Sequence, residues 1–373
     1  MFVPGVHQGL HVRVPRRAIT FAIALLAIVT VVVAWAALDA RPNSREHLGV
    51  PASPLPVGTL GSVALLVPEG PVDHLFVQRA VSDATRSFIT DFPSTFTLHA
   101  HGAASPMGDR VAVLWVDGQP GSARLTIVDL RSGDRVETPG TYSYLSTLSW
   151  SRDGLRVAAL AAARPDASGR FRATVVEIDA ASGVARPVAE FDSVLAAAPV
   201  GYSADSTRLL VVTIDQSGST VWSAGDGKLQ NVAQLSAGRT QDWRLSPDAA
   251  RLAFTQVYGA GATRAVSGRV LTILTRNIVG ASGVGDQLGA TWRAGFEAPV
   301  FGGPGGDVQL AAGADGEYLV PTAWSPDGSG LVANVYGRDQ SSSRSLQYIT
   351  AQGRFEFASE IGASFLGFVV NLD

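Results

Sequence analysis

The sequence predicts an all-β fold: a single β-propeller of four-stranded antiparallel sheets, preceded by one membrane-spanning helix. Three observations predict it: short segments that alternate between apolar and polar residues, a repeated turn motif, and one long uncharged segment near the N-terminus. Charged residues make up 16% of the 373 residues, below the roughly 25% of average soluble domains, whereas 40 glycines and 20 prolines supply turns. Low charge and many turn residues favour β-structure.

The N-terminal segment predicts a membrane anchor. Residues 18–38 are uncharged, and a helix of this length, at about 1.5 Å per residue, spans the roughly 30 Å hydrocarbon core of a bilayer. Residues 1–17 contain three arginines and no acidic residue, so the positive-inside bias keeps this short basic tail in the cytoplasm. We therefore expect a single-pass protein of the cytoplasmic membrane, with everything after residue 38 outside.

A cleaved signal peptide is the alternative to an anchor. Ala34, Trp35 and Ala36 match an A-x-A cleavage site that follows an apolar stretch, and cleavage near Ala36 would release a soluble exported protein. Arg16 and Arg17 also suggest a twin-arginine export signal, although the residues after them continue that motif poorly. Under each interpretation the body of the protein is exported.

Residues 39–58 form a predicted stalk, and residues 59–373 form the predicted propeller. The stalk contains four prolines, a density that excludes a regular helix and favours an extended chain. Alternating segments rich in β-branched residues then recur throughout the body, which is the pattern of strands. These segments are 110–116, 124–130, 173–179, 208–214 and 269–275.

A repeated turn motif predicts how the strands are organised. WSPDG at 324–328 has partial counterparts upstream, and the motif serines at positions 105, 151, 203, 246 and 325 are 46, 52, 43 and 79 residues apart. The first three intervals fit one propeller blade of roughly 40–50 residues. A second hairpin glycine follows in four of the repeats, at Gly133, Gly183, Gly227 and Gly353.

The number of blades is predicted to be about six, with seven possible. Five motifs indicate five blades, and residues 60–101 together with the C-terminal segment 362–371 can close one more by pairing the two ends of the body. The 79-residue interval is expected to hold a long insertion around 258–300, which could instead form an extra blade.

We interpret the motif as a structural turn. Proline presets φ near −65°, aspartate accepts backbone hydrogen bonds, and glycine takes a positive φ. Trp150 and Trp324, just before their turns, are expected to pack between blades. The predicted turn residues are Ser105, Gly108, Ser151, Asp153, Gly154, Ser203, Asp205, Ser246, Pro247, Asp248, Ser325, Pro326, Asp327 and Gly328.

The WSPDG-type turn, repeated at this spacing and followed by an apolar strand, resembles the WD40-like repeats of TolB-like propellers, which also form the N-terminal domains of prolyl oligopeptidases and dipeptidyl peptidase IV. The resemblance covers about residues 100–373, and only 325–328 carry the full Ser-Pro-Asp-Gly. It implies an architecture and says little about function, because such propellers have many roles. No G-x-S-x-G elbow occurs, so we expect no peptidase nucleophile.

Composition excludes several function classes. Without cysteine the chain has no disulfide, no thiolate nucleophile and no Cys-ligated metal. The net charge is −3 although the tail is basic, so the body is mildly acidic, which argues against nucleic-acid binding. No G-x-x-x-x-G-K-[ST] phosphate-binding loop occurs. We expect no cofactor and no catalytic residue.

His99 and His101 are weak candidates for a metal site. Residues i and i+2 of a strand point to the same face, so the pair could chelate one ion with a third ligand such as His74 or Asp91. Nothing in the sequence places that ligand nearby, so we expect exposed strand histidines and no metal. Three aspartates that recur after the turns are interpreted as solvated hairpin tips, with calcium or ligand contacts as the alternative: Asp117, Asp215 and Asp339.

The expected function is non-catalytic. A membrane-anchored propeller outside the cytoplasm would bind or scaffold a protein of the bacterial envelope, a polymer or a small ligand. The alternative is an exported hydrolase or lyase with its site at the central channel, formed by polar residues from several blades. A third possibility is a partner subunit of a transporter or protease.

Overall fold

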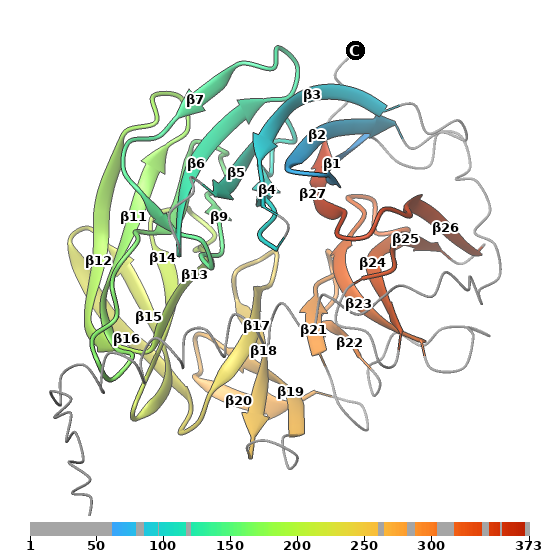
Figure 1. The fold of residues 1–373 in the computed structure, drawn as a ribbon. Helices are drawn as coiled ribbons and strands as arrows, with labels where there is room; N and C mark the ends of the chain where they lie inside the picture. The colour runs from blue at the N-terminus through green and yellow to red at the C-terminus, as the bar shows by residue number, and fades with distance from the viewer. Residues whose placement is uncertain are drawn as a thin grey trace, which may run out of the picture. The chain divides into compact units, whose positions relative to one another are not determined.

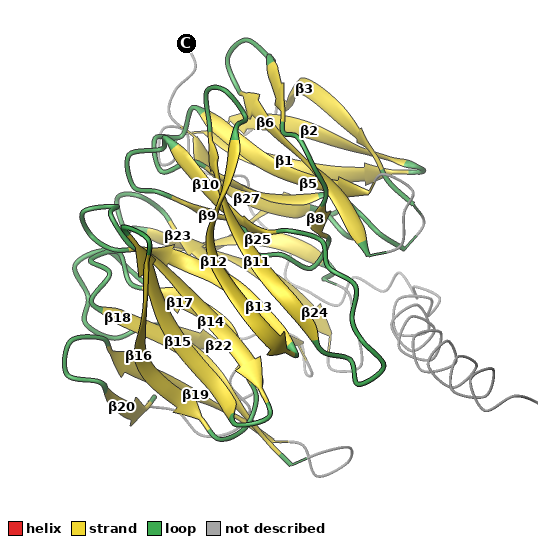
Figure 2. Cartoon of the chain, turned by 90° about the vertical axis from the view of Figure 1, so that its left-hand side faces the viewer, coloured by secondary structure: helices red, strands yellow, loops and turns green. Residues whose placement is uncertain are grey.

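The computed structural model describes residues 62–79, 86–95, 97–116, 121–259, 265–281, 288–303, 317–337, 343–350 and 353–369. These residues form strands, turns and loops, and none of them is helical (Figure 2). Within these ranges no helix could cross a membrane, and the predicted anchor at 18–38 and stalk at 39–58 lie outside them. The anchor, the stalk and the domain boundaries therefore stay predictions.

Six antiparallel sheets follow one another around a ring, which is the arrangement of a β-propeller (Figure 1). The first sheet has the order β27 (Ser364–Val369), β1 (Ser62–Glu69), β2 (Val72–Arg79) and β3 (Arg86–Pro93). The second has β4 (His101–Ala104), β5 (Arg110–Val116), β6 (Ser122–Asp129) and β7 (Arg135–Glu137), and β8 (Tyr142–Ser143) also pairs with β6. The third has β9 (Ser149–Trp150), β10 (Arg156–Leu160), β11 (Phe171–Asp179) and β12 (Ala185–Val194).

The remaining sheets continue the ring. The fourth contains β13 (Ala196–Tyr202), β14 (Leu209–Asp215), β15 (Gly218–Gly225) and β16 (Lys228–Ser236). The fifth contains β17 (Thr240–Leu245), β18 (Arg251–Tyr258), β19 (Ala265–Thr272) and β20 (Asn277–Gly280). The sixth contains β23 (Glu317–Trp324), β24 (Gly330–Gly337), β25 (Ser345–Thr350) and β26 (Gly353–Ala358), and a separate pair consists of β21 (Leu288–Thr291) and β22 (Val300–Gly302).

The core lies between neighbouring sheets. The second strand of a sheet is covered by a sheet on each side, and β14 accordingly reads LLVVTI with all six side chains buried. The outer strand β16 begins instead with four exposed residues. Between the third and fourth sheets, the apolar cluster includes Val175, Phe191, Tyr202 and Val211. Burial of such clusters, at roughly 25 cal/mol per Å² of apolar surface, is what holds the sheets side by side.

The two ends of the body close the ring. Residue Ser62 of β1 pairs with Val369 of β27, and the pairing continues to Leu66 and Ser364. The C-terminal strand thus lies inside the N-terminal sheet, which confirms the predicted pairing of the chain ends. Six sheets of four or more strands also confirm the predicted number of blades.

The segment around 258–300 is not a single insertion. Its described part contains β19 and β20, which are the outer strands of the fifth sheet, followed by β21. Strand β21 contacts β17 on one side and β23 on the other, so the β21–β22 pair lies in the ring between the fifth and sixth sheets. The predicted strand segment 269–275 overlaps β19, but counting the turns could not assign it to a sheet, because the marker serine lies only in the first turn of a sheet.

Candidate functional site

The two candidate metal ligands do not share a strand. His101 is the first residue of β4, whereas His99 lies in the loop before it. The Nδ1 atom of His99 lies 2.9 Å from Oδ1 of Asp73, and Nε2 of His101 donates a hydrogen bond to the Tyr144 carbonyl oxygen at 2.6 Å. The assumption that both histidines point from one face of a strand is therefore wrong.

His101 has a structural environment. Burial lowers the pKa of its imidazole below the ordinary value, and the Tyr144 carbonyl opposes this shift. A neutral ring can donate Nε2–H to that carbonyl, which ties β4 to the loop after β8. The other proposed ligands, His74 and Asp91, lie opposite each other in β2 and β3. In the part of the chain that the structure describes, no three His, Asp or Glu residues are placed to hold a metal.

Asp215, the hairpin aspartate that lies within the described residues, stabilises its own turn. Its Oδ1 atom accepts hydrogen bonds from the backbone N–H of Ser217 at 2.7 Å and from the Ser217 hydroxyl at 2.6 Å. The equivalent residues Asp117 and Asp339 lie outside the described residues.

The five motif turns share one backbone geometry. Each joins the innermost strand of its sheet to the second strand, and the N–H of the fourth residue donates to the carbonyl of the motif serine. The fourth residue has a positive φ, 68° at Gly154 and 69° at Gly328, as glycine readily allows. Ser206 and Ala249 occupy the same position at 57°, where a side chain is strained.

The side chains of the motif serine and aspartate stabilise four of the turns by hydrogen bonds within the turn. In four turns the serine hydroxyl donates to the aspartate two residues later, at 2.6 Å for Ser203 and Asp205, and the serine oxygen accepts the backbone N–H five residues on. The Ser203 hydroxyl lowers the pKa of Asp205 to about 2, and backbone N–H donation adds to this. The other three pairs are Ser151–Asp153, Ser246–Asp248 and Ser325–Asp327.

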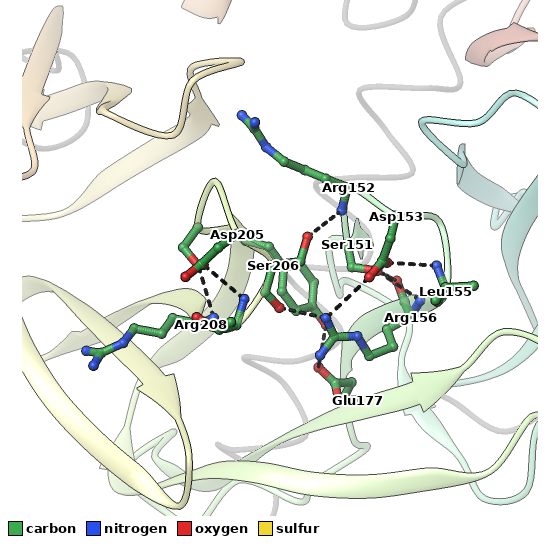
Figure 3. A network of polar contacts seen from close by, with 12 residues as sticks. Ser151, Arg152, Asp153, Leu155, Arg156, Glu177, Asp205, Ser206 and Arg208 are labelled. Carbon is green, nitrogen blue, oxygen red and sulfur yellow. Dashed lines mark hydrogen bonds and ion pairs between the residues drawn. The ribbon is translucent and has the colours of Figure 1, made fainter.

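The turns also bind neighbouring sheets to each other. The backbone N–H of Arg152 donates to the Ser206 hydroxyl at 3.1 Å, and the Arg156 guanidinium donates to the Ser206 carbonyl at 2.6 Å (Figure 3). Met107 of the preceding turn packs on Gly154. A Cβ atom added at Gly154 would lie only 2.8 Å from Met107 Cγ, so a larger residue would not fit here without a shift. These turns therefore form one continuous face of the ring, which we call the turn face.

A buried carboxylate lies just beneath this face. The Glu177 side chain is 6% exposed, and its Oε1 accepts hydrogen bonds from Arg186 Nη2 at 2.6 Å and Nε at 3.1 Å. Its Oε2 accepts hydrogen bonds from Arg156 at 3.3 Å and from the Tyr202 hydroxyl at 3.0 Å. Burial, followed by the Glu177 charge, raises the pKa of Tyr202, so its hydroxyl stays a donor. Both oxygens of this buried charge are thus satisfied.

A groove of about 430 Å³ opens beside this network, between the third and fourth sheets. Arg156, Glu177 and Arg186 line one wall, and Asp205, Thr207 and Asp226 line the other. The Arg186 side chain is 69% exposed, so it can still donate to a bound group. No histidine, lysine or cysteine occurs among the described residues that line the groove. Its charged and hydroxyl-bearing side chains can form ion pairs and hydrogen bonds with a polar group.

A second polar group lies on an innermost strand. In β17 the register with β18 shifts between Gln241 and Arg244, and Asp242 within this bulge has a φ of 56°. The Asp242 carboxylate accepts hydrogen bonds from the Gln241 side chain at 3.2 Å and from the Gly289 backbone N–H at 3.4 Å. Strained non-glycine residues and bulges in strands are often associated with functional sites.

The sequence prediction missed the groove, although two signals for it exist. Glu177 is in phase with the buried residues Ala173 and Val175, so an acidic residue lies on the core-facing side of an alternating strand. An arginine also follows four of the motif serines by five residues, and Arg156 is one of these. Neither signal indicates that Glu177 and Arg156 contact each other. Their other partners, Arg186, Tyr202 and Ser206, come from other strands or from the next sheet.

Comparisons with known proteins identify the fold. The β-propeller domain of the Trilobed protease from Pyrococcus furiosus matches with a TM-score of 0.53 and 11% identity, over 84% of this chain and 99% of that domain. Acylaminoacyl peptidase from Pyrococcus horikoshii matches with a TM-score of 0.54 and 10% identity, over 83% of this chain and 54% of the peptidase. Oligogalacturonate lyase in complex with manganese matches with a TM-score of 0.50 and 11% identity, over 70% of this chain and 79% of the lyase.

TolB from Acinetobacter baumannii also matches, with a TM-score of 0.48 and 12% identity, over 82% of this chain and 66% of TolB. The chain thus spans about half the length of the peptidase and about two thirds of TolB. No protein-family profile matches the chain, and no curated protein matches it. At these identities the likeness concerns the fold alone, and the three matches with TM-scores of 0.50 or more confirm the propeller that the repeated turns predicted.

Proposed function

We propose that this chain is a membrane-anchored, non-catalytic binding module whose propeller lies outside the cytoplasm and binds a partner on its turn face. The uncharged segment 18–38 and the arginines before it support the anchor and its orientation. The groove between the third and fourth sheets is the observation that carries the binding role.

The groove supports binding because its charged groups are already fixed. Arg156 and Arg186 are held by the buried Glu177, and Asp205 is held by its own turn. Groups that are ordered before a ligand arrives lose little conformational entropy on binding, which favours affinity. The volume of about 430 Å³ lies within the range of small ligand sites and can also accept one or two side chains of a protein.

Topology is tested by fusing a reporter after Asp373. We expect activity from a reporter that works only outside the cytoplasm, and we expect the full-length protein to stay in the membrane after carbonate washing. A body released by cleavage near Ala36 would show a signal peptide in place of the anchor. Reporter activity only inside the cell would contradict both the anchored form and the cleaved, exported form.

Binding in the groove is tested separately, by placing a photo-crosslinking amino acid at Thr207 of the full-length protein in living cells. A discrete adduct is expected at Thr207, and Arg186→Gln should reduce it because that guanidinium lines the groove. Val184, which is 62% exposed and does not line the groove, is the matched control position. Equal adducts at both positions, or none at Thr207, would contradict the proposed binding surface.

An exported enzyme with its site at the central channel is a second candidate, favoured by the strained Asp242 on innermost strand β17. Two stacked phenols on the neighbouring sixth sheet, Tyr318 and Tyr336, have ring centroids 5.4 Å apart. Burial raises the pKa of Tyr336, and the nearby Tyr318 and Asp242 add to this shift. If the full-length protein turns over any of a panel of polysaccharides and peptides, and Asp242→Asn abolishes this turnover without lowering Tm, the enzyme becomes the better proposal.

A further inference from the structure

A hydrogen bond from a tryptophan links neighbouring innermost strands at two places in the ring. Nε1 of Trp150, just before the third-sheet turn, donates to the Ala103 carbonyl at 2.9 Å. Nε1 of Trp292, just after β21, donates to the Arg244 carbonyl at 2.8 Å. Trp324 precedes the Ser-Pro-Asp-Gly turn in the same way, but its Nε1 is buried and has no hydrogen-bond partner among the residues that the structure describes. A buried indole N–H normally finds an acceptor, so this donor is an exception.

The second donor without a partner in the described part of the chain is the guanidinium of Arg293, which lies beside Trp324. Its central carbon is 4.3 Å from the ring centroid of Phe296 and 5.2 Å from that of Trp324. The aromatic rings hold the guanidinium in place through cation–π contact. The Arg293 guanidinium makes no hydrogen bond or ion pair with the residues that the structure describes, although it carries five N–H donors.

Gly328, the last residue of WSPDG, makes room for this arginine. A Cβ atom added at Gly328 would lie 3.1 Å from Arg293 Nε, which is closer than most contacts that Cβ atoms make in proteins. The motif therefore does more here than turn the chain. It places Arg293, Trp324 and the 54% exposed Phe296 together on the turn face, and we call these three residues the Arg293 cluster.

The chemistry of the Arg293 cluster selects an anion. A guanidinium matches a planar carboxylate through two parallel hydrogen bonds, and the indole N–H can supply a third. Glu297, with a side chain that is 91% exposed, lies one residue beyond Phe296, and Asp327 belongs to the facing turn. Two neighbouring carboxylates repel a doubly charged phosphate more than a singly charged carboxylate. The exposed Phe296 ring adds apolar contact for a peptide chain.

We infer that the Arg293 cluster binds a side-chain carboxylate of an acidic polypeptide partner. The inference goes beyond the proposed function, because it concerns residues outside the groove and stands whether or not the groove binds anything. The bound carboxylate neutralises Arg293 and accepts a hydrogen bond from the Trp324 indole.

The test is calorimetric titration of the purified full-length protein with a blocked peptide of alternating glutamate and alanine. Saturable binding is expected, and Arg293→Gln should weaken it at least tenfold. Arg152→Gln is the matched control, because the Arg152 side chain points away from its network (Figure 3) and should change the affinity less than twofold. Equal weakening by both substitutions would show only general charge attraction and would overturn the inference, as would a lack of saturable binding.

A pair of tryptophan variants separates binding from folding. Trp324→Phe removes a donor that has no partner, so we expect severalfold weaker peptide binding with Tm unchanged or raised. Trp150→Phe removes a donor that is used by the Ala103 carbonyl, so it should lower Tm and leave the affinity unchanged. Unchanged peptide affinity in Trp324→Phe would overturn the inferred hydrogen bond from the indole to the carboxylate. Inorganic phosphate serves as the competing probe: tighter binding of phosphate than peptide, lost in Arg293→Gln, would overturn the carboxylate assignment.

Discussion

Ser62 in β1 lies directly opposite Val369 in β27, so the first and last described strands of the body are hydrogen-bonded partners in one sheet. This pairing is non-local, and it joins the first and last strands of the ring. Its strength should therefore control the stability of the whole propeller.

We expect a disulfide between Ser62→Cys and Val369→Cys to form readily, because directly paired residues of antiparallel strands lie within disulfide reach. The chain has no cysteine of its own, so no other disulfide can form. Closing so long a loop should raise the free energy of unfolding by about 3–5 kcal/mol. Chemical denaturation of the oxidised and reduced forms measures this directly, and the reduced form is the control. Equal stability of the two forms would mean that the ends stay paired in the unfolded state or that closure is not limiting.

The buried Glu177 should be far more important for stability than a surface ion pair of the same type. Glu177→Gln keeps the shape but removes the charge that receives hydrogen bonds from Arg156, Arg186 and Tyr202, and we expect a loss of about 2–3 kcal/mol. Glu190→Gln is the control, because Glu190 pairs with an exposed Arg172 and should cost less than about 0.5 kcal/mol. Urea denaturation of both variants checks the difference. Similar losses would show that the Glu177 network is no stronger than a surface contact.

The motif serine should be what lowers the pKa of its aspartate. We expect Ser203→Ala to raise the pKa of Asp205 from about 2 toward its ordinary value of roughly 3.9, since the hydroxyl is the largest cause of the shift. Carboxyl NMR titration measures this change, with Asp248 in an intact turn as the control. A pKa of Asp205 that does not move in Ser203→Ala would assign the shift to the backbone donors instead.

The same shift sets a pH window for stability. The folded-state pKa of Asp205 lies below its unfolded value, so the stability that its charge contributes is present above about pH 4 and is lost as the pH falls toward 2. The stability difference between wild type and Ser203→Ala should therefore shrink across this interval. It should not vanish, because the hydrogen bond from the Arg208 N–H to the serine oxygen does not titrate.

Positive φ at the fourth turn position predicts opposite effects in two repeats. Gly328→Ala should cost about 1–2 kcal/mol, because its φ is 69° and the new Cβ would press on Arg293. Ala249→Gly should instead stabilise by up to about 1 kcal/mol, because it relieves strain at a φ of 57°. Thermal unfolding of the two variants is the measurement. Destabilisation by Ala249→Gly would show that the entropy of glycine in the unfolded chain outweighs the strain.

The sequence by itself determined the class and the repeat of this protein. Period-two segments such as 110–116 indicate strands because alternate side chains face the core, and the serine-marked turns recur because each joins the first two strands of a sheet. The pairing of the chain ends could also be predicted, because a ring leaves its first and last strands as neighbours. Anchor and stalk are likewise sequence predictions, based on the lack of charge in 18–38 and the prolines in 39–58.

Only the tertiary structure decided where chemistry can occur. Local rules describe a residue and its near neighbours, so they found the turn around Ser151 but not the contact of Arg156 with Ser206 in the next sheet. The same limit explains why His99 and His101 were paired on a strand that begins only at His101. Trp150 and Trp324 have equivalent places in the sequence, and only the packing shows that the Trp150 indole has an acceptor whereas the Trp324 indole has none within the described ranges. Partners of buried polar groups come from distant strands, and the fold alone brings them together.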